Sequence, residues 1–213
     1  MPSDTVVHVI DDDEAARQSL EFLLRSAGFD VRAYETAMAF LDALPQAKAG
    51  CVISDVRMPG LSGIDLLKRL KELDVGMPVI IITGHGDVPL AVEAMKAGAA
   101  DFLEKPFDDE LMLEAVRSAL SDYRETRARG AERAAIDERL AELSPREREV
   151  LEGLVAGHPN KTIAYDLGIS PRTVEIYRAN VMTKMKAASL SELVRMALIS
   201  GLLGDAPPSG PTP

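Results

Sequence analysis

The chain has 213 residues, of which 46% are hydrophobic, and a formal net charge of −10. This length and composition favour two modest globular domains over one. No apolar run is long enough to span a bilayer, and the chain does not open on a signal peptide, so a cytoplasmic location is expected. The single cysteine, Cys51, excludes an internal disulfide, and its apolar surroundings predict a buried core position.

The negative charge is concentrated in the first half of the chain. Residues 1–122 carry 22 acidic and 11 basic residues, whereas residues 123–213 carry 12 and 13. Because only the first half is strongly acidic, the net charge does not exclude a polyanion as a ligand of the second half.

The first 120 residues alternate short apolar runs with amphipathic stretches. Strands are predicted at 6–10, 29–34, 51–54, 79–82 and 100–103. Helices are predicted at 14–27, 36–45, 62–73, 87–97 and 109–122. This alternation predicts right-handed crossovers and a parallel sheet with helices on both faces. The ligand crevice of such a sheet lies at the carboxyl ends of its strands.

The second half of the chain is predicted to be helical. Residues 123–140 are rich in charge and alanine and are expected to form a helical linker. Four helices are predicted near 145–156, 160–167, 171–186 and 190–200. Their start signals are Ser144-Pro145 with Glu147, Asn160 as a cap, Ser170-Pro171, and Ser189 with Glu192. The resulting domains are 1–122, the linker 123–140, the helical domain 141–203 and a disordered tail at 204–213.

Polar side chains gather where the predicted strands end. Asp11 and Asp12 follow the first strand, Asp55 the third and Thr83 the fourth, and the fifth strand leads to Lys105. A flavodoxin-like strand order, 2-1-3-4-5, would bring these groups to one crevice. Carboxylate oxygens suit Mg²⁺, which would let a phosphoryl group approach Asp55 as the nucleophile. Lys105 and Thr83 would then contact the phosphoryl oxygens.

The first 120 residues resemble the two-component receiver domain. The matching blocks are Val-Ile-Asp11-Asp12-Asp13, Ser-Asp55-Val-Arg-Met58-Pro59-Gly60, Ile-Ile-Thr83-Gly and Phe102-Leu-Glu-Lys105-Pro106. The resemblance implies that Asp55 is the phosphoacceptor and that Lys105, preceding a cis peptide to Pro106, contacts the phosphate. Thr83 and Phe102 resemble the switch pair. The implied Mg²⁺ ligands are Asp11, Asp12, Asp55 and the backbone carbonyl of Arg57. Asp13 is expected only to favour the helix start by its charge.

The helix predicted at 171–186 has two distinct faces. Val174, Val181 and Met185 share one face, which indicates a core contact. The opposite face carries Arg172, Glu175, Ile176, Ala179, Asn180 and Thr183. Small and polar side chains flanked by bases suit the major groove of DNA. By periodicity alone, a four-helix interaction module without DNA binding is an equally good interpretation.

The order of motifs in the second half resembles the LuxR-type helix-turn-helix. The blocks are Leu143-Ser-Pro-Arg-Glu-Arg-Glu-Val-Leu151, Gly157 with Asn160-Lys161-Thr-Ile163-Ala164, and Ser170 with Thr173-Val174-Glu175. The whole chain is thus similar to a NarL/FixJ-type response regulator. The implied DNA contacts are Lys161, Arg172, Thr173, Glu175, Ile176, Tyr177, Arg178, Ala179, Asn180 and Lys184. Tyr177 stands where this family often has histidine.

The resemblance implies a transcriptional activator and not an enzyme, beyond a part in its own phosphorylation and slow dephosphorylation. The implied partners are a sensor histidine kinase, promoter DNA, RNA polymerase and a second copy of the phosphorylated chain. The resemblance in the motif Thr83-Gly-His-Gly-Asp87 further implies that the kinase is an oxygen-sensing haem protein and that the promoters are those of nitrogen fixation.

Two alternatives stay open on the sequence. A phosphohydrolase of the haloacid dehalogenase kind would use an acid pair such as Asp11 and Asp13, but Glu14-Ala15 follow where threonine is needed, and there is no room for a cap domain. A DNA-binding protein whose receiver never needs phosphate is the second alternative.

Overall fold

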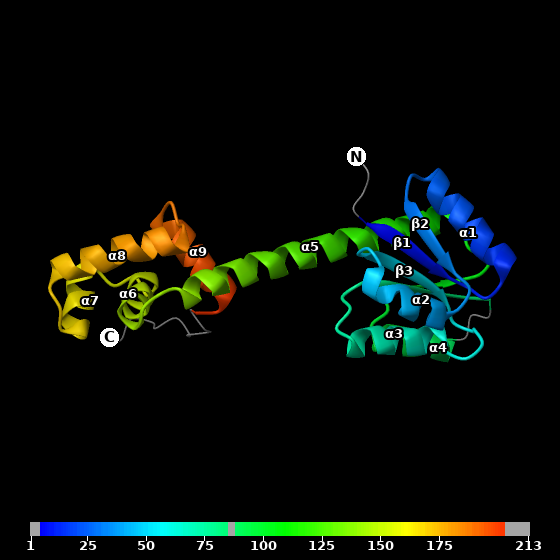
Figure 1. The fold of residues 1–213 in the computed structure, drawn as a ribbon, viewed down its shortest axis with the longest axis horizontal. Coiled ribbons are helices and arrows are strands. Elements are labelled where there is room, and N and C mark those ends of the chain that lie inside the picture. The colour runs from blue at the N-terminus through cyan, green and yellow to red at the C-terminus, as the bar shows by residue number, and fades with distance from the viewer. Residues whose placement is uncertain (1–4, 85–87, 203–213) are drawn as a thin grey trace, which may run out of the picture. The chain divides into compact units, whose positions relative to one another are not determined.

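The computed structural model describes residues 5–84 and 88–202, which fall into two compact units divided between Thr126 and Arg127 (Figure 1). The predicted tail at 204–213 and the last three residues of the Thr83–Asp87 motif lie outside the described residues. Within the described ranges, no helix combines the length and apolarity of a membrane span.

The first unit is built on a five-stranded parallel sheet of order β2-β1-β3-β4-β5. The strands are β1 (Val6–Ile10), β2 (Asp30–Tyr34), β3 (Gly50–Asp55), β4 (Val79–Thr83) and β5 (Asp101–Glu104). Every residue of β1, β3 and β4 is buried, because helices cover both faces of the sheet. The flavodoxin-like order expected from the sequence is confirmed.

Helices pack on the two faces of this sheet. They are α1 (Glu14–Ser26), α2 (Ala37–Ala43) with the 3₁₀ turn η1 (Leu44–Gln46), α3 (Gly63–Glu72), α4 (Val88–Ala97) and the start of α5 (Asp109–Ala141). Neighbouring β1 residues point to opposite faces. Val7 and Val9 join the core beneath α1 and α5, whereas Ile10 joins the core that contains Phe40 and Leu66. Cys51 is buried in β3, as predicted.

Gly63 brings the start of α3 directly onto the end of β3. A Cβ at this position would collide with the backbone carbonyl of Asp55. The Gly63 N–H donates to the carbonyl of Val56 at 3.1 Å. Glycine is therefore required here by a close backbone approach, and this approach fixes the β3–α3 loop beside Asp55.

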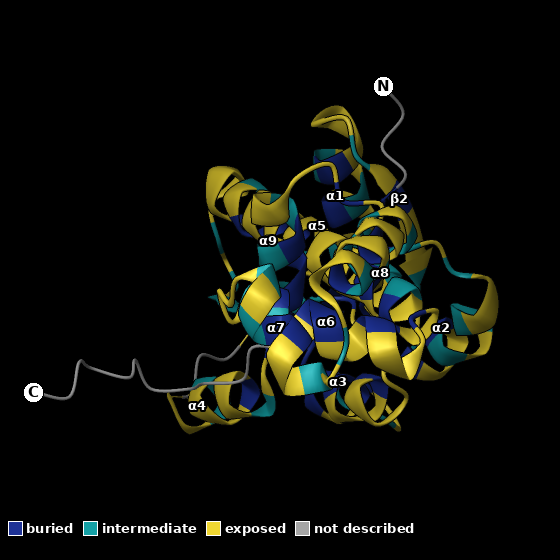
Figure 2. Cartoon of the chain, turned by 90° about the vertical axis from the view of Figure 1, so that its left-hand side faces the viewer, coloured by how far each residue is buried: buried dark blue, intermediate teal, exposed yellow. Residues whose placement is uncertain are grey.

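The second unit contains the end of α5 and four further helices, each with both buried and exposed residues (Figure 2). These are α6 (Pro145–Val155), α7 (Asn160–Leu167), α8 (Pro171–Met185) and α9 (Leu190–Ser200). Ser144 and Glu147 form the predicted capping box, and Ser170 and Ser189 cap α8 and α9. The predicted cap at Asn160 is wrong. Pro159 occupies the N-cap of α7 without a side-chain bond, and Asn160 is the first helical residue.

Helix α5 runs without interruption through the residues predicted as a linker. Tyr123 packs against the core of the first unit, and the Arg124 guanidinium donates to the Thr5 hydroxyl at 3.0 Å. Ile136 and Leu140 are buried in the core of the second unit. The linker predicted at 123–140 is therefore helical, as expected. Its two ends pack against the cores of the two units, and only residues 124–134 are exposed throughout.

Candidate functional site

The carboxyl edge of the sheet in the first unit brings together two acids and one base. Asp11 follows β1 and Asp55 ends β3, and these two strands are paired neighbours. The Lys105 ammonium lies 2.7 Å from Asp11 Oδ2 and 2.8 Å from Asp55 Oδ1. The exposed fractions of the two carboxylate side chains are only 1% and 11%. Three residues from distant parts of the sequence thus form one buried charged cluster, as the strand-end argument predicted.

Backbone groups hold the remaining carboxylate oxygens of this cluster. Asp55 Oδ2 accepts from the Arg57 N–H at 2.7 Å, and Asp11 Oδ1 accepts from the Asp13 N–H at 3.0 Å. The Arg17 guanidinium donates to the Asp11 carbonyl at 2.6 Å, which ties α1 to the end of β1. The acids are therefore fixed in orientation before any ligand arrives.

Lys105 is placed by the end of β5 and by the neighbouring strand. Its backbone N–H donates to the Thr83 carbonyl at 2.7 Å, and the Lys105–Pro106 peptide is cis, as expected. Burial acts to lower the pKa of Lys105, but hydrogen bonds and charge from Asp11 and Asp55 outweigh it and raise that pKa above its usual value. The ammonium is consequently charged across the physiological range.

The other predicted residues of this edge differ in exposure. Thr83 is buried at the end of β4, and Phe102 is half-buried in β5 against the core that contains α3. Asp12 is exposed. Asp13 caps α1 by accepting from the N–H groups of Ala15 and Ala16, and these bonds lower the pKa of its carboxyl. Asp13 therefore serves the helix start, as predicted.

A divalent cation would meet only oxygen donors here. Among residues 5–84 and 88–202, no three His, Cys, Asp or Glu side chains are grouped as a ready metal site. Asp11 and Asp55 instead share the Lys105 ammonium, and Asp12 faces solvent. A hollow of about 700 Å³ beside Asp12 is lined also by Arg57 and by the start of α3. An oxygen-only donor set with room for water fits Mg²⁺, which takes few protein carboxylates and keeps several waters.

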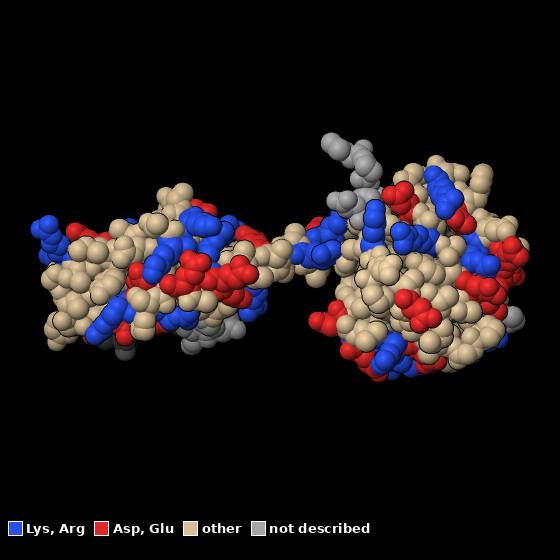
Figure 3. Space-filling model, in the orientation of Figure 1, with Lys and Arg blue, Asp and Glu red and all other residues tan. Residues whose placement is uncertain are grey.

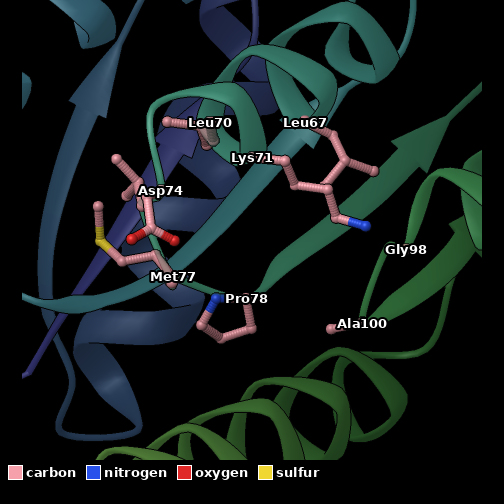
Figure 4. A pocket seen from close by; sticks show the side chains of 10 residues that line it. Leu67, Leu70, Lys71, Asp74, Met77, Pro78, Gly98 and Ala100 are labelled. Atoms are coloured by element: carbon pink, nitrogen blue, oxygen red, sulfur yellow. The ribbon is translucent and has the colours of Figure 1, made fainter.

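The amino ends of β4 and β5 have a separate hollow of about 320 Å³ (Figure 4). Its charged side chains are Lys71 and Asp74, and its walls include Leu67, Leu70 and Met77. Because it lies at the opposite end of these strands from Asp55 and Lys105, it is not part of the acidic site.

Helix α8 in the second unit presents the exposed face predicted from its sequence. Val174, Val181 and Met185 are fully buried. Arg172, Glu175, Ile176, Ala179, Asn180 and Thr183 are exposed, as is Lys161 on α7. Thr173, Tyr177 and Arg178 are half-buried at the margins. Ile176 is 57% exposed, so its side chain is open to contact from this face of the helix. The unit carries acidic and basic side chains on one visible face (Figure 3).

Lys184 is the predicted DNA contact whose position differs most from expectation. Its ammonium lies 2.6 Å from Glu147 Oε2 and 3.2 Å from the Glu142 carbonyl. Glu147 was expected only to close the capping box, and Arg139, for which no role was expected, donates to the Met185 carbonyl at 3.2 Å. No local signal links Lys184 to Glu147, because 37 residues separate them.

Both units match known protein families. Residues 7–117 match the response regulator receiver domain, and residues 141–197 match the bacterial regulatory proteins of the luxR family. The chain therefore belongs to the NarL/FixJ family of response regulators, and it is a transcription regulator controlled through phosphorylation of a receiver domain.

Within this family the chain is similar to FixJ. It is 61% identical to the transcriptional regulatory protein FixJ of Azorhizobium caulinodans over 213 residues, which are 100% of both chains. It is 59% identical to FixJ of Bradyrhizobium diazoefficiens over 199 residues, covering 93% of this chain and 97% of the relative. The crystal structure of full-length FixJ from B. japonicum, 58% identical, aligns with a TM-score of 0.60 over 93% of this chain and 98% of that one.

Proposed function

We propose that Asp55 accepts a phosphoryl group from a sensor histidine kinase and that this modification activates transcription by the chain. The convergence of Asp11, Asp55 and Lys105 at the carboxyl edge of the sheet carries the proposal. A carboxylate oxygen of Asp55 forms the new bond to phosphorus as the bond from phosphorus to the imidazole nitrogen of the donor breaks. The products are an acyl phosphate on Asp55 and a histidine that regains its proton from solvent.

The neighbouring groups have complementary roles in this proposal. Asp11, Asp12, Asp55 and the backbone carbonyl of Arg57 would hold Mg²⁺, which supplies positive charge between the acids and the phosphoryl group. Lys105 is already 2.8 Å from Asp55 and needs little movement to donate to a phosphoryl oxygen. The Thr83 hydroxyl is the second proposed donor.

The proposed output of the first unit is a dimer of phosphorylated chains. Thr83 and Phe102 are the proposed switch residues that reshape the surface formed by α4, β5 and the start of α5. Val88, Val92 and Met95 support this assignment, because they follow one face of α4 and are 76%, 45% and 49% exposed. A dimer would present two copies of α8 to paired half-sites in promoter DNA.

The domain limits and DNA contacts keep their predicted form in this proposal. The receiver spans 1–122, the helical connection 123–140 and the DNA-binding domain 141–203. The contacts are Lys161, Arg172, Thr173, Glu175, Ile176, Tyr177, Arg178, Ala179 and Asn180, whereas Lys184 is bonded within the unit. The similarity to FixJ supports a FixL-like haem kinase, nitrogen-fixation promoters and RNA polymerase as partners.

The test is the intact mass of the chain after incubation with Mg²⁺ and acetyl phosphate, followed by size-exclusion chromatography. We expect one added phosphoryl group on the wild type, none on Asp55→Asn, and a shift to dimer only for the wild type. Asp42→Asn, which changes an exposed acid in α2, is the matched control and should behave as wild type.

Each alternative has its own result. Phosphoryl addition to Asp55→Asn would contradict the assignment of the phosphoacceptor. Sustained hydrolysis of a small phosphate ester would favour the phosphohydrolase. Equal DNA affinity of wild type and Asp55→Asn under phosphorylating conditions would favour a receiver that does not control DNA binding.

A further inference from the structure

The carboxyl end of α8 is held by polar contacts from two other helices of the second unit. The Lys184 ammonium donates to Glu147 Oε2 at 2.6 Å, near the start of α6, and to the Glu142 carbonyl at 3.2 Å, just beyond α5. The Arg139 guanidinium, in the last turn of α5, donates to the Met185 carbonyl at 3.2 Å. These five residues are called the α5–α8 clamp.

Glu147 makes this clamp depend on charge. Its side chain is only 5% exposed, and the same oxygen that meets Lys184 accepts from the Ser144 N–H at 2.8 Å. The hydrogen bond from Lys184, followed by that from Ser144, lowers the pKa of Glu147 to about 2, so the carboxylate is ionised at neutral pH. A buried carboxylate without its cation is strongly unfavourable, and the position of Lys184 is therefore tightly constrained.

Arg139 acts on the same end of the helix by a different contact. The last carbonyls of an α-helix lack partners within the helix and carry a partial negative charge. Met185 is the last residue of α8, and the Arg139 guanidinium satisfies its carbonyl. The end of α8 is thus bonded both through a side chain and through the backbone.

The clamp restricts shifts of α8 along its axis, which apolar packing alone would allow. Val174, Val181 and Met185 bury one face of α8 and set which side faces outward. Apolar contacts are non-directional and allow small shifts along the helix axis, whereas charge-assisted hydrogen bonds are short and directional. Base recognition by side chains such as Glu175 and Asn180 requires placement to a fraction of an ångström.

We propose that the α5–α8 clamp positions α8 for base recognition, and that Lys184 acts through Glu147 and not by contact with a DNA phosphate. Lys184 is therefore a positioning residue of the DNA-binding unit. The inference rests on the proposed DNA-binding function. It replaces the direct DNA contact that the resemblance implied for Lys184, since its ammonium is already bonded to a carboxylate and a carbonyl.

The experiment compares affinities of the phosphorylated full-length chain for two DNA duplexes. One is a duplex selected by the wild-type chain from a random pool, and the other is an unselected duplex of equal length. Lys184→Met keeps most of the length of the side chain and removes the charge. Arg195→Met is the matched control, because the exposed Arg195–Glu132 pair joins α9 to α5 at 2.6 Å without touching α8.

The positioning role predicts a loss confined to the selected duplex. We expect Lys184→Met to weaken that complex by about tenfold, the effect of one misplaced base contact, with little change on unselected DNA. The slope of log affinity against log salt concentration should not change, because no phosphate contact is lost. Lys184→Arg should restore most of the affinity, and Arg195→Met should leave the ratio between the duplexes unchanged.

Glu147→Gln separates the interpretations further and provides a second variant if Lys184→Met does not fold. An amide oxygen can still accept from the Ser144 N–H, but the charge pair is lost. The positioning role predicts a loss on the selected duplex alone. A phosphate contact by Lys184 predicts equal or tighter binding to both duplexes, since the competing carboxylate is gone.

Two results would overturn the inference. Equal losses on both duplexes with a salt slope reduced by about one would establish a phosphate contact by Lys184. Unchanged affinity for both duplexes in Lys184→Met and Glu147→Gln would restrict the clamp to stability. If the wild-type chain selects no duplex at all, the proposed DNA-binding function fails, which is a different result from failure of the clamp.

Discussion

In the part of the chain that the structure describes, each unit has a cluster in which a lysine is bonded to buried carboxylate, and the two clusters have opposite character. Lys105 lies 2.7 and 2.8 Å from Asp11 and Asp55, and Lys184 lies 2.6 Å from Glu147. In the first cluster two carboxylates share one ammonium and the exposed Asp12 lies beside them, so negative charge is in excess. In the second, one carboxylate meets one ammonium and one backbone N–H, so its charge is balanced.

The comparison shows that ion-pair distance alone does not identify a functional site. The first cluster lies at the open carboxyl edge of a parallel sheet, where a further cation or an anion bound with it can be accommodated. The second lies at a capping box between packed helices, where the Lys184 ammonium is bonded to a carboxylate and to a backbone carbonyl. Charge balance and remaining bonding capacity distinguish a site that receives a ligand from one that holds a helix.

Leu140→Ala should have the largest effect on stability, and it tests whether α5 supports the cluster of Glu147 and Lys184. Leu140 is 6% exposed in the core of the second unit, one residue beyond Arg139. Truncation of a buried leucine costs about 2–5 kcal/mol of unfolding free energy. Urea denaturation measures the change. Leu111→Ala, in the same helix but 50% exposed, should cost far less. A loss below about 1 kcal/mol for Leu140→Ala would show that α5 does not anchor the clamp.

Lys105→Met should distinguish the two clusters by their response to Mg²⁺. Removal of either lysine leaves a buried carboxylate unpaired and should lower the unfolding free energy by about 1–3 kcal/mol. Added Mg²⁺ should recover much of the loss in Lys105→Met, because a cation can replace the ammonium between Asp11 and Asp55. Thermal unfolding with EDTA or Mg²⁺ measures this. Equal responses of Lys105→Met and Lys184→Met would contradict the distinction.

Acidification should affect the two units at different pH. His8 is buried in β1, and its Nε2–H donates to the Lys48 carbonyl at 2.9 Å. Burial lowers the pKa of His8 below 6.5. The unfolded chain therefore binds the proton more readily, and the first unit should lose stability as pH falls below 6.5. In the second unit the pKa of Glu147 is about 2, below its ordinary 4.5. The ionised Glu147 carboxylate therefore stabilises the folded second unit at neutral pH. This stabilisation should persist until pH falls below 4.5 and disappear toward pH 2.

Hydrogen exchange resolved by peptide measures both units in one experiment. Protection in the β-strands of the first unit should decrease between pH 7 and 5 after correction for intrinsic exchange, while α6 and α8 keep theirs. His8→Gln, which retains a donor toward Lys48, should remove this pH dependence. Simultaneous loss of protection in both units would argue against separate titrating groups.

The cluster of Asp11, Asp55 and Lys105 could be predicted from the sequence, and the Glu147–Lys184 pair could not. Strands buried on both faces produce apolar runs such as Val79–Thr83, and residues at their ends are then brought to a common edge by topology. For this reason the grouping of Asp11, Asp55 and Lys105 can be predicted from the sequence. The Glu147–Lys184 pair depends on how α8 packs against α6, and helical periodicity within α8 does not reveal a partner in another helix.

Burial within α5 was also beyond sequence reasoning. Charge and alanine in residues 123–140 correctly indicate a helix. Ile136 and Leu140 are isolated apolar residues in that stretch, and their burial requires partners from the helices that follow. The error at Asn160 arises because α7 begins without a side-chain cap, at Pro159, while Ile163 and Ala164 of this helix are buried.

Gly130→Ala should have the smallest effect and concerns the exposed part of α5, which contributes to neither cluster. A Cβ at Gly130 has no atom within 4 Å, so alanine should stabilise the helix by about 0.5–1 kcal/mol. Slower hydrogen exchange across residues 125–135, with no change in α8 or β3, is the expected result. Gly153→Ala in α6 is the contrasting variant, because its Cβ would lie 2.8 Å from Ile163 and should destabilise the second unit. Faster exchange in Gly130→Ala would mean that this stretch needs a glycine for a reason other than helix geometry.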